Sequence, residues 1–238
     1  IVIVRSRVSD FVTKFLDKIF PNSSSKNNKE LELASERGLI VHNIFELTFA
    51  KYVDPDTGIV RKQPINSSPQ LETYEKKYAK DGELSMPEKI DKYVKELIAL
   101  YPNSYFLTEI PIFNKSLTVG GTIDLMIVEP NKKVHIYDWK TKKADVHKGQ
   151  GIIQKREKID PWNIKAWRIQ LDSYMDILKN NYGVESFGKV RMIPIMTEFE
   201  TNGTTISNIN IGSESNPDIR QRQLLAVPSK QELTGLSE

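Results

Sequence analysis

Cysteine is absent from the 238-residue sequence. Its absence excludes disulfides, thiolate nucleophiles, iron–sulfur clusters and cysteine-ligated zinc sites together. The sequence also lacks any run of about 18 apolar residues, the length at which a membrane-spanning helix is expected. The apolar opening Ile-Val-Ile-Val is too short for the core of a signal peptide and is followed at once by Arg5 and Arg7. These absences favour an intracellular protein without membrane-spanning segments.

The net charge is only +3, which is too small to indicate a nucleic-acid partner by itself. The charge is unevenly distributed, however, because the stretch 131–168 alone carries +7, from eleven Lys or Arg against four Asp or Glu. A concentrated basic region is typical of a surface that binds a polyanion. A solvated lysine-rich loop would give the same pattern, and charge alone does not separate the two interpretations.

The spacing of apolar residues predicts one α/β domain over about residues 1–212, followed by a polar tail or linker at 213–238. The part before about residue 100 is expected to be helical, and the core at about 101–200 is expected to hold the strands. This order predicts a mixed central β-sheet flanked by helices. Helices are predicted at 9–20, 30–53, 85–101 and 161–182, and strands at 105–113, 117–128, 134–139 and 189–199.

Local signals refine these boundaries. Residues 85–88 (SMPE) match a capping box, and Asp-Pro at 160–161 supplies an N-cap followed by proline in the first helical position. The stretch 54–84 has turn signals and weak periodicity, so we expect an irregular insertion there, and we expect a basic loop at 141–159. Pro194 favours an edge position for its strand.

Two acidic residues and a lysine are expected to meet on the second and third strands. The intervening Glu-Pro-Asn-Lys-Lys indicates a hairpin centred on Asn131, with Asp124 seven residues before that centre and Asp138 seven residues after it. The two carboxylates therefore fall opposite each other, where Cβ atoms lie about 4.5–5.5 Å apart. Lys140 shares the face of Asp138 because residues two apart on a strand point the same way. Their neighbour Trp139 is expected to face a helix layer.

Two carboxylates at this separation repel each other unless a cation or a proton lies between them. Oxygen ligands in an open site suit Mg²⁺ or Mn²⁺, which can polarise a phosphate, and a nearby lysine can stabilise the developing charge. A solvent-facing Asp–Lys–Asp cluster without a metal is the alternative. The largely apolar strands argue against it, because acids are costly to bury without a cation or another partner.

The sequence of these strands resembles a known family. Residues 121–125 (GTIDL) and 136–141 (IYDWKT) are similar to the G-x-I-D and (I/V)-x-D-x-K-T signatures of RecB-type nuclease domains in the PD-(D/E)XK superfamily. Upstream, residues 37–42 (RGLIVH) resemble the G-x-x-(V/I)-H helix of that group, and Glu109 matches an acidic residue on the strand before the aspartate. Downstream, residues 170–174 (QLDSY) match its Q-x-x-x-Y motif.

The resemblance implies a restriction-endonuclease-like core and a Mg²⁺- or Mn²⁺-dependent DNA nuclease. Glu109 is an accessory candidate under this interpretation, although it could equally be an exposed strand residue, and Tyr174 could instead belong to the helix core. The residues implicated are, for catalysis, Asp124, Asp138 and Lys140; for the metal, His42, Asp124, Asp138 and the Trp139 backbone carbonyl; and for contacting DNA or bracing the site, Gln170 and Tyr174.

Basic residues near the core would guide the DNA, and we assign this role to Lys142, Lys143 and Arg168. The substrate is expected to be single-stranded DNA or duplex ends, cleaved by an exonuclease in recombination, repair or replication. Such a protein would be intracellular, either cytoplasmic or nucleoid-associated, and could be encoded by a phage. The sequence does not begin with Met and shows no helicase motifs, so we expect either a stand-alone nuclease or a part of a larger polypeptide or complex. The alternatives are a non-catalytic DNA-binding or scaffolding module on the same fold and a sequence-specific endonuclease.

Overall fold

The computed structural model describes most of the chain between residues 28 and 211. The predicted helix at 9–20 and the polar tail at 213–238 lie outside the described residues, and the domain boundary at 212 stays a prediction. Within the described part, no helix is both long and apolar enough to cross a membrane. The described residues are 6–7, 28–116, 119–143, 146–149, 152–155, 161–199 and 205–211.

A six-stranded mixed sheet forms the centre of the fold, in the order β1-β3-β4-β7-β8 with β2 paired to β3. The β2–β3, β3–β4 and β7–β8 pairs are antiparallel, whereas β1–β3 and β4–β7 are parallel. The β4–β7 pair can be parallel because the helix α5 (Pro161–Tyr182) lies between these two strands in the chain. The strands are β1 (Ser6–Arg7), β2 (Tyr105–Phe113), β3 (Val119–Val128), β4 (Val134–Lys143), β7 (Phe187–Phe199) and β8 (Ile206–Ile211).

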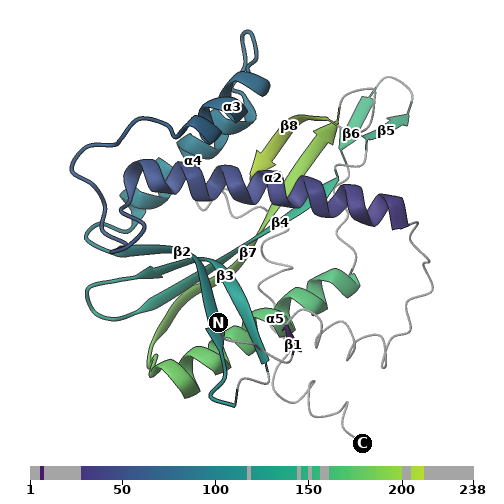
Figure 1. The fold of residues 1–238 in the computed structure, drawn as a ribbon. Helices are drawn as coiled ribbons and strands as arrows, with labels where there is room; N and C mark the ends of the chain where they lie inside the picture. Colours follow the sequence, from purple (N-terminus) through teal and green to yellow (C-terminus); the bar gives the residue numbers. More distant parts are fainter. Residues whose placement is uncertain are drawn as a thin grey trace, which may run out of the picture.

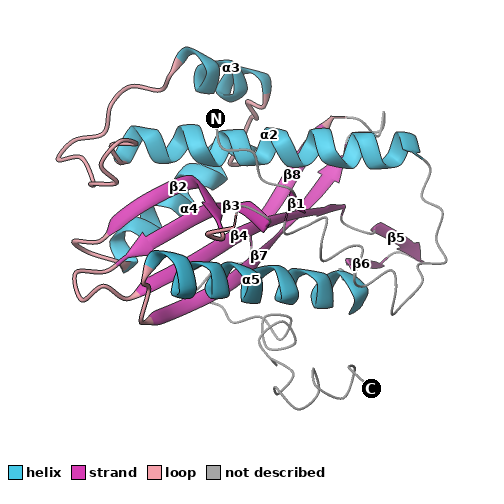
Figure 2. Cartoon of the chain, turned by 60° about the horizontal axis from the view of Figure 1, so that its bottom comes forward, coloured by secondary structure: helices cyan, strands magenta, loops and turns pink. Residues whose placement is uncertain are grey.

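Helices cover both faces of this sheet. The long helix α2 (Asn28–Tyr52) runs along one face, where α4 (Met86–Leu100) packs beside it, and α5 (Pro161–Tyr182) runs along the opposite face (Figures 1 and 2). This arrangement confirms the predicted α/β class, with a mixed sheet between helices and a helical region ahead of the strands.

The sheet has a hydrophobic core on each face, and β4 contributes side chains to both. Trp139 faces α2, where it stacks on Phe45 with ring centroids 4.5 Å apart, and Tyr93 of α4 contacts it edge-on at 5.9 Å. On the other face, Ile136 packs in a second cluster with Trp167 of α5. The prediction that Trp139 faces a helix layer is therefore confirmed. Asp138 lies between these apolar positions, and its side chain is held at the α5 face.

The sequence signals at helix ends appear in the structure. Ser85 and Glu88 form the expected capping box at α4: the Glu88 side chain accepts from the Ser85 backbone N–H at 2.7 Å, and the Ser85 hydroxyl accepts from the Glu88 N–H at 3.4 Å. Such a cap contributes about 1 kcal/mol. Helix α5 begins at Pro161 and ends at Tyr182, before Gly183 with φ +72°, a conformation that glycine adopts without strain.

Several boundaries differ from the predictions. The insertion at 54–84 contains a short helix, α3 (Pro69–Lys77), which begins with an N-cap at Ser68 and proline in the first turn. The predicted basic loop instead contains an antiparallel pair, β5 (Val146–Gly149) and β6 (Ile152–Lys155). Strand β8 was not predicted either.

The extent of β4 and the position of β7 also differ. Strand β4 continues past the predicted end to Lys143, because its ladder with β7 runs on to the Lys143–Thr197 pair whatever the charge of its side chains. Strand β7 lies between β4 and β8, so the edge position inferred from proline is wrong for the strand as a whole. Pro194 itself precedes the first β7–β8 pair, Ile195–Ile211, so its missing N–H removes no bond of that ladder.

Candidate metal centre

The β3–β4 hairpin has the predicted register. Val128 pairs with Val134 and Leu125 with Tyr137, as a centre at Asn131 requires. Asp124 lies one position beyond the last of these pairs, and its Oδ2 accepts a hydrogen bond of 2.6 Å from the backbone N–H of Trp139. The Asp124 side chain therefore reaches across to β4, where this bond fixes one carboxylate oxygen and leaves the other directed toward α2.

Glu109 reaches the same place through an irregularity in β2. Thr108 pairs with Leu125 and Ile110 with Ile123, and Glu109 lies between these pairs with φ +50°. A residue other than glycine in this left-handed region carries a strain of about 1 kcal/mol or more, and such strain is often found at functional sites.

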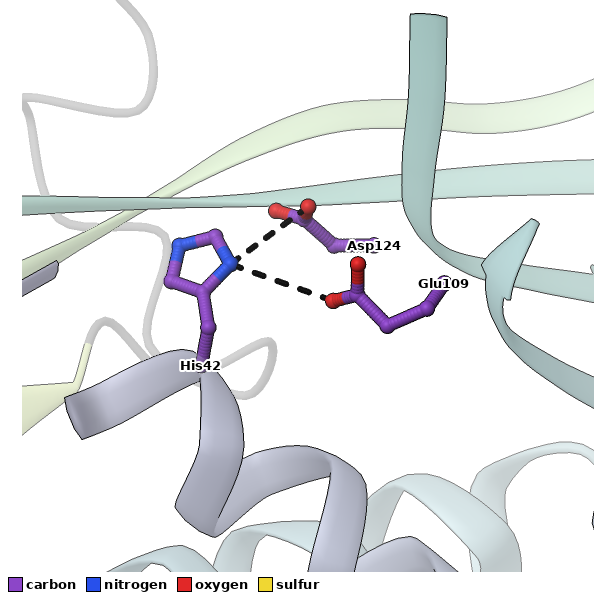
Figure 3. A group of neighbouring side chains, drawn as sticks. All are labelled: His42, Glu109 and Asp124. Carbon is purple, nitrogen blue, oxygen red and sulfur yellow. Dashed lines mark ion pairs between the residues drawn. The ribbon is translucent and has the colours of Figure 1, made fainter. Parts of the chain in front are cut away.

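Three ligand-type side chains from three elements converge beside this irregularity (Figure 3). The His42 Nδ1 atom of α2 lies 3.5 Å from Asp124 Oδ1 and 4.0 Å from Glu109 Oε1. One ligand atom from each residue lies within 4.8 Å of the other two. An octahedral Mg²⁺ with bonds of about 2.1 Å places its ligands about 3–4.2 Å apart. The three side chains therefore fit a small divalent cation with little movement.

The His42 ring is oriented for this role. Its Nε2 lies 3.1 Å from the Trp139 carbonyl oxygen, which can only accept, so we assign the ring proton to Nε2 and a lone pair to Nδ1. Burial lowers the pKa of His42, which favours the neutral, ligating form. Metal-binding histidines commonly donate their other N–H to a carbonyl in this way. The Trp139 oxygen has a second lone pair, so this hydrogen bond is compatible with its predicted ligand role.

The two carboxyls of the cluster favour protonation in the absence of a cation. Burial raises the pKa of Glu109 to about 7, and the negative charges of Glu46 and Asp138 raise it further. Burial likewise raises the pKa of Asp124 well above its usual range; the Asp138 charge adds to this, whereas Lys140 opposes it. A divalent cation would reverse this balance, because it stabilises the ionised forms.

Asp138 lies outside the three-residue group and is held from the α5 side. Its Oδ2 lies 2.6 Å from Lys140 Nζ, an ion pair rather than a directed hydrogen bond. Its Oδ1 accepts from Gln170 Nε2 at 3.4 Å, and the same amide donates to the Tyr174 hydroxyl at 2.7 Å. Asp138 is 1% exposed and Tyr174 3% exposed, so neither contacts bulk solvent. The predicted Asp138–Lys140 pair and the Gln170–Tyr174 pair therefore meet at one carboxylate.

The basic residues assigned to DNA are brought together only in part. Lys142 shares the Asp138 and Lys140 face of β4, and its ammonium lies 5.0 Å from the centre of the Trp167 ring. Arg168 is half-buried on α5, and the side chain of Lys143 lies outside the described residues. Trp167 is 7% exposed and belongs to the core.

Gly121 has a role that the sequence did not reveal. A Cβ at this position would lie 2.7 Å from Cε1 of Tyr174, closer than side chains tolerate. Glycine inside a strand often marks a close approach of another group. That general signal was present in the sequence, but the partner, on α5, could not be read from it.

The sequence match agrees with this geometry. A family model described as the PD-(D/E)XK nuclease superfamily matches residues 10–223. No curated protein matches the sequence. The matched range contains every residue of the site, from His42 on α2 to Tyr174 on α5, and it supports the restriction-endonuclease-like assignment of the mixed sheet. The match does not extend to the RecB type within the superfamily.

Proposed function

This chain belongs to the PD-(D/E)XK nuclease superfamily, and we propose that it is a RecB-type deoxyribonuclease that hydrolyses phosphodiester bonds with Mg²⁺ or Mn²⁺. The observation that carries the proposal is the convergence of His42, Glu109 and Asp124 within 4.8 Å. This cluster lies beside Asp138, whose carboxylate is paired with Lys140 at 2.6 Å.

The ligand set suits a cation that also binds substrate phosphate. The neutral imidazole and the carboxylates of Glu109 and Asp124, together with Asp138 as a further proposed ligand, leave coordination positions for water and phosphate oxygens, and the lack of thiolates disfavours softer metals. A cation held here supplies Lewis acidity at the scissile phosphate and at the attacking water. The Trp139 N–H and carbonyl keep Asp124 and His42 in place, so little reorganisation is needed for binding.

Lys140 is the proposed catalytic lysine. Its side chain is 23% exposed and its ammonium lies against Asp138, at the border between the buried carboxylate and solvent. From there it can orient an attacking water or stabilise the charge that develops on the phosphate oxygens in the transition state. We assign to Lys142, two residues further along the same face, a contact with a flanking phosphate.

The finer assignment follows the motifs. The order of RGLIVH, GTIDL, IYDWKT and QLDSY along the chain supports the RecB type. We further propose an exonuclease that acts on single strands or duplex ends in recombination, repair or replication, as part of a larger polypeptide or complex.

Cleavage of end-labelled DNA tests the function. The protein should degrade single-stranded and duplex substrates with Mg²⁺ or Mn²⁺ and lose this activity with EDTA. Asp138→Ala and Lys140→Ala should abolish cleavage while circular dichroism shows a folded protein. An Asp138→Ala protein as active as the parent would refute the assignment.

A covalently closed circular substrate separates the two modes of cleavage. An exonuclease should leave the circle intact and degrade it once it has been linearised, whereas cutting of the circle would identify an endonuclease. Discrete fragments from the circle would favour the sequence-specific alternative.

A further inference from the structure

The ring of Tyr174 lies directly against the backbone of Gly121 on β3. A Cβ at Gly121 would lie 2.7 Å from the Tyr174 Cε1 atom and 3.0 Å from its hydroxyl oxygen. Contacts below 3.0 Å force something to move, and here the neighbour is a buried aromatic ring with only two side-chain torsions. Only glycine at position 121 therefore admits the ring in its present position.

The position of the ring determines the position of an amide. The Tyr174 hydroxyl accepts a hydrogen bond of 2.7 Å from Gln170 Nε2, and the same nitrogen lies 3.4 Å from Asp138 Oδ1. Gln170 and Tyr174 are one helical turn apart, so both side chains lie on the same face of α5. The Gln170 amide thus lies between a buried hydroxyl and the buried carboxylate.

We propose that Gly121 and Tyr174 are positioning residues that orient Asp138 through Gln170. Gly121 seats the ring, the ring hydroxyl orients the Gln170 amide, and the amide holds Oδ1 while Lys140 holds Oδ2. The proposal rests on the proposed nuclease function, since it assigns these residues to the orientation of that site.

Burial argues against direct contact between Tyr174 and DNA. The Tyr174 side chain is 3% exposed, and its hydroxyl is already hydrogen-bonded to Gln170. A phosphate could reach it only after α5 or β3 moved. If Tyr174 positions Asp138, its removal should affect metal binding and the chemical step. If Tyr174 contacts DNA, its removal should instead affect substrate affinity and the salt dependence of that affinity.

Two glycine substitutions separate positioning from general destabilisation. Gly121→Ala should displace the Tyr174 ring. Gly188→Ala is a matched control, because a Cβ there would collide with the ring of His135, another buried aromatic side chain. His135 lies on the part of β4 nearer the β3–β4 turn. Both variants should lower the melting temperature. Only Gly121→Ala should weaken Mn²⁺ binding, followed by the electron paramagnetic resonance signal of free Mn²⁺, and lower kcat.

The expected changes have the size seen when partners of metal ligands are removed, about tenfold in Mn²⁺ dissociation constant and in kcat. The KM for DNA at saturating Mn²⁺ should stay within about twofold. Tyr174→Phe, which keeps the ring on Gly121 and removes the hydroxyl, should act in the same direction. Tyr182→Phe is its control, because Tyr182 is on the same helix. Among the described residues, its hydroxyl accepts a hydrogen bond from the Phe113 N–H, which lies away from Asp138.

A double-mutant cycle tests the connection through Gln170. If the Tyr174 hydroxyl acts through the amide, Tyr174→Phe should have no further effect on Mn²⁺ affinity or kcat in a Gln170→Leu protein. Equal effects in both backgrounds, a rise in KM alone, or the same loss from Gly188→Ala would overturn the proposal. A parent protein that binds Mn²⁺ but cleaves no DNA would refute the nuclease function instead. The Mn²⁺ affinities of the variants would still test the positioning role of Gly121 and Tyr174.

Discussion

Glu109 makes a quantitative prediction about metal binding and pH. Its pKa of about 7 means that most molecules carry a proton on this carboxyl at pH 6 and few do at pH 8. A metal ion binds the ionised carboxylate, so the proton must leave first. For one group with this pKa, the apparent Mn²⁺ affinity should rise about tenfold between pH 6 and pH 8 and become nearly constant above that range.

Neighbouring groups determine how far the measurement can exceed this value. Asp124, whose pKa is also raised by burial, adds to the pH dependence in the same direction. His42 adds little above its ordinary pKa, because burial shifts its own titration to lower pH. Glu109→Gln should remove the contribution of that residue and flatten the profile, at the cost of weaker binding at pH 8.

Calorimetric titration with Mn²⁺ in two buffers of different ionisation enthalpy measures the protons released. At pH 7 binding should release at least about half a proton, which is the share of Glu109 alone. If binding released no proton between pH 6 and pH 8, and the affinity did not change, Glu109 would not be part of the cation site.

Three further outcomes follow from the structure. Phe45→Ala should destabilise the fold by about 3–5 kcal/mol in urea denaturation, because the ring is 1% exposed and stacks on Trp139; a loss below about 1 kcal/mol would contradict this packing. Lys142→Ala should raise KM and reduce the salt slope of DNA binding by about one while kcat is kept, and an unchanged slope would exclude a phosphate contact. Without metal, the free energy of unfolding should fall as the pH rises from the ordinary Glu pKa of 4.5 to about 7, because the folded state keeps a proton on Glu109 that the unfolded state loses. Glu109→Gln should reduce this dependence of stability on pH, as measured by thermal melts at several pH values.

The sequence predicted the register of the β3–β4 hairpin because the information for it is local. Side chains alternate along a strand, so the shared face of Asp138 and Lys140 follows from their positions alone. The grouping of Asp124 with His42 and Glu109, apart from Asp138, does not follow from this alternation. The starts of helices α4 and α5 were predicted for the same reason as the hairpin register, because Ser85 with Glu88 and the proline at 161 are signals contained within a few residues.

The parts that the sequence did not predict depend on contacts between distant segments. The resemblance named Glu109 as an accessory candidate, but its meeting with His42 and Asp124 depends on a left-handed backbone conformation opposite β3, which no hydrophobic period reveals. The need for glycine at position 121 arises from the Tyr174 ring, which belongs to a distant helix, so the local sequence does not reveal it. The β5 and β6 strands were hidden because their basic, polar residues do not show the alternation of a half-buried sheet. Backbone pairing defines them.

The most direct test of the account combines metal binding and cleavage in Asp124→Asn. This change keeps the shape of the side chain and its acceptor oxygen for the Trp139 N–H, but removes the charge from the cluster. Mn²⁺ affinity and Mn²⁺-dependent cleavage of end-labelled DNA should both fall by more than about tenfold while the protein stays folded. Cleavage and affinity equal to those of the parent protein would contradict the claim that this cluster is the metal centre of a nuclease.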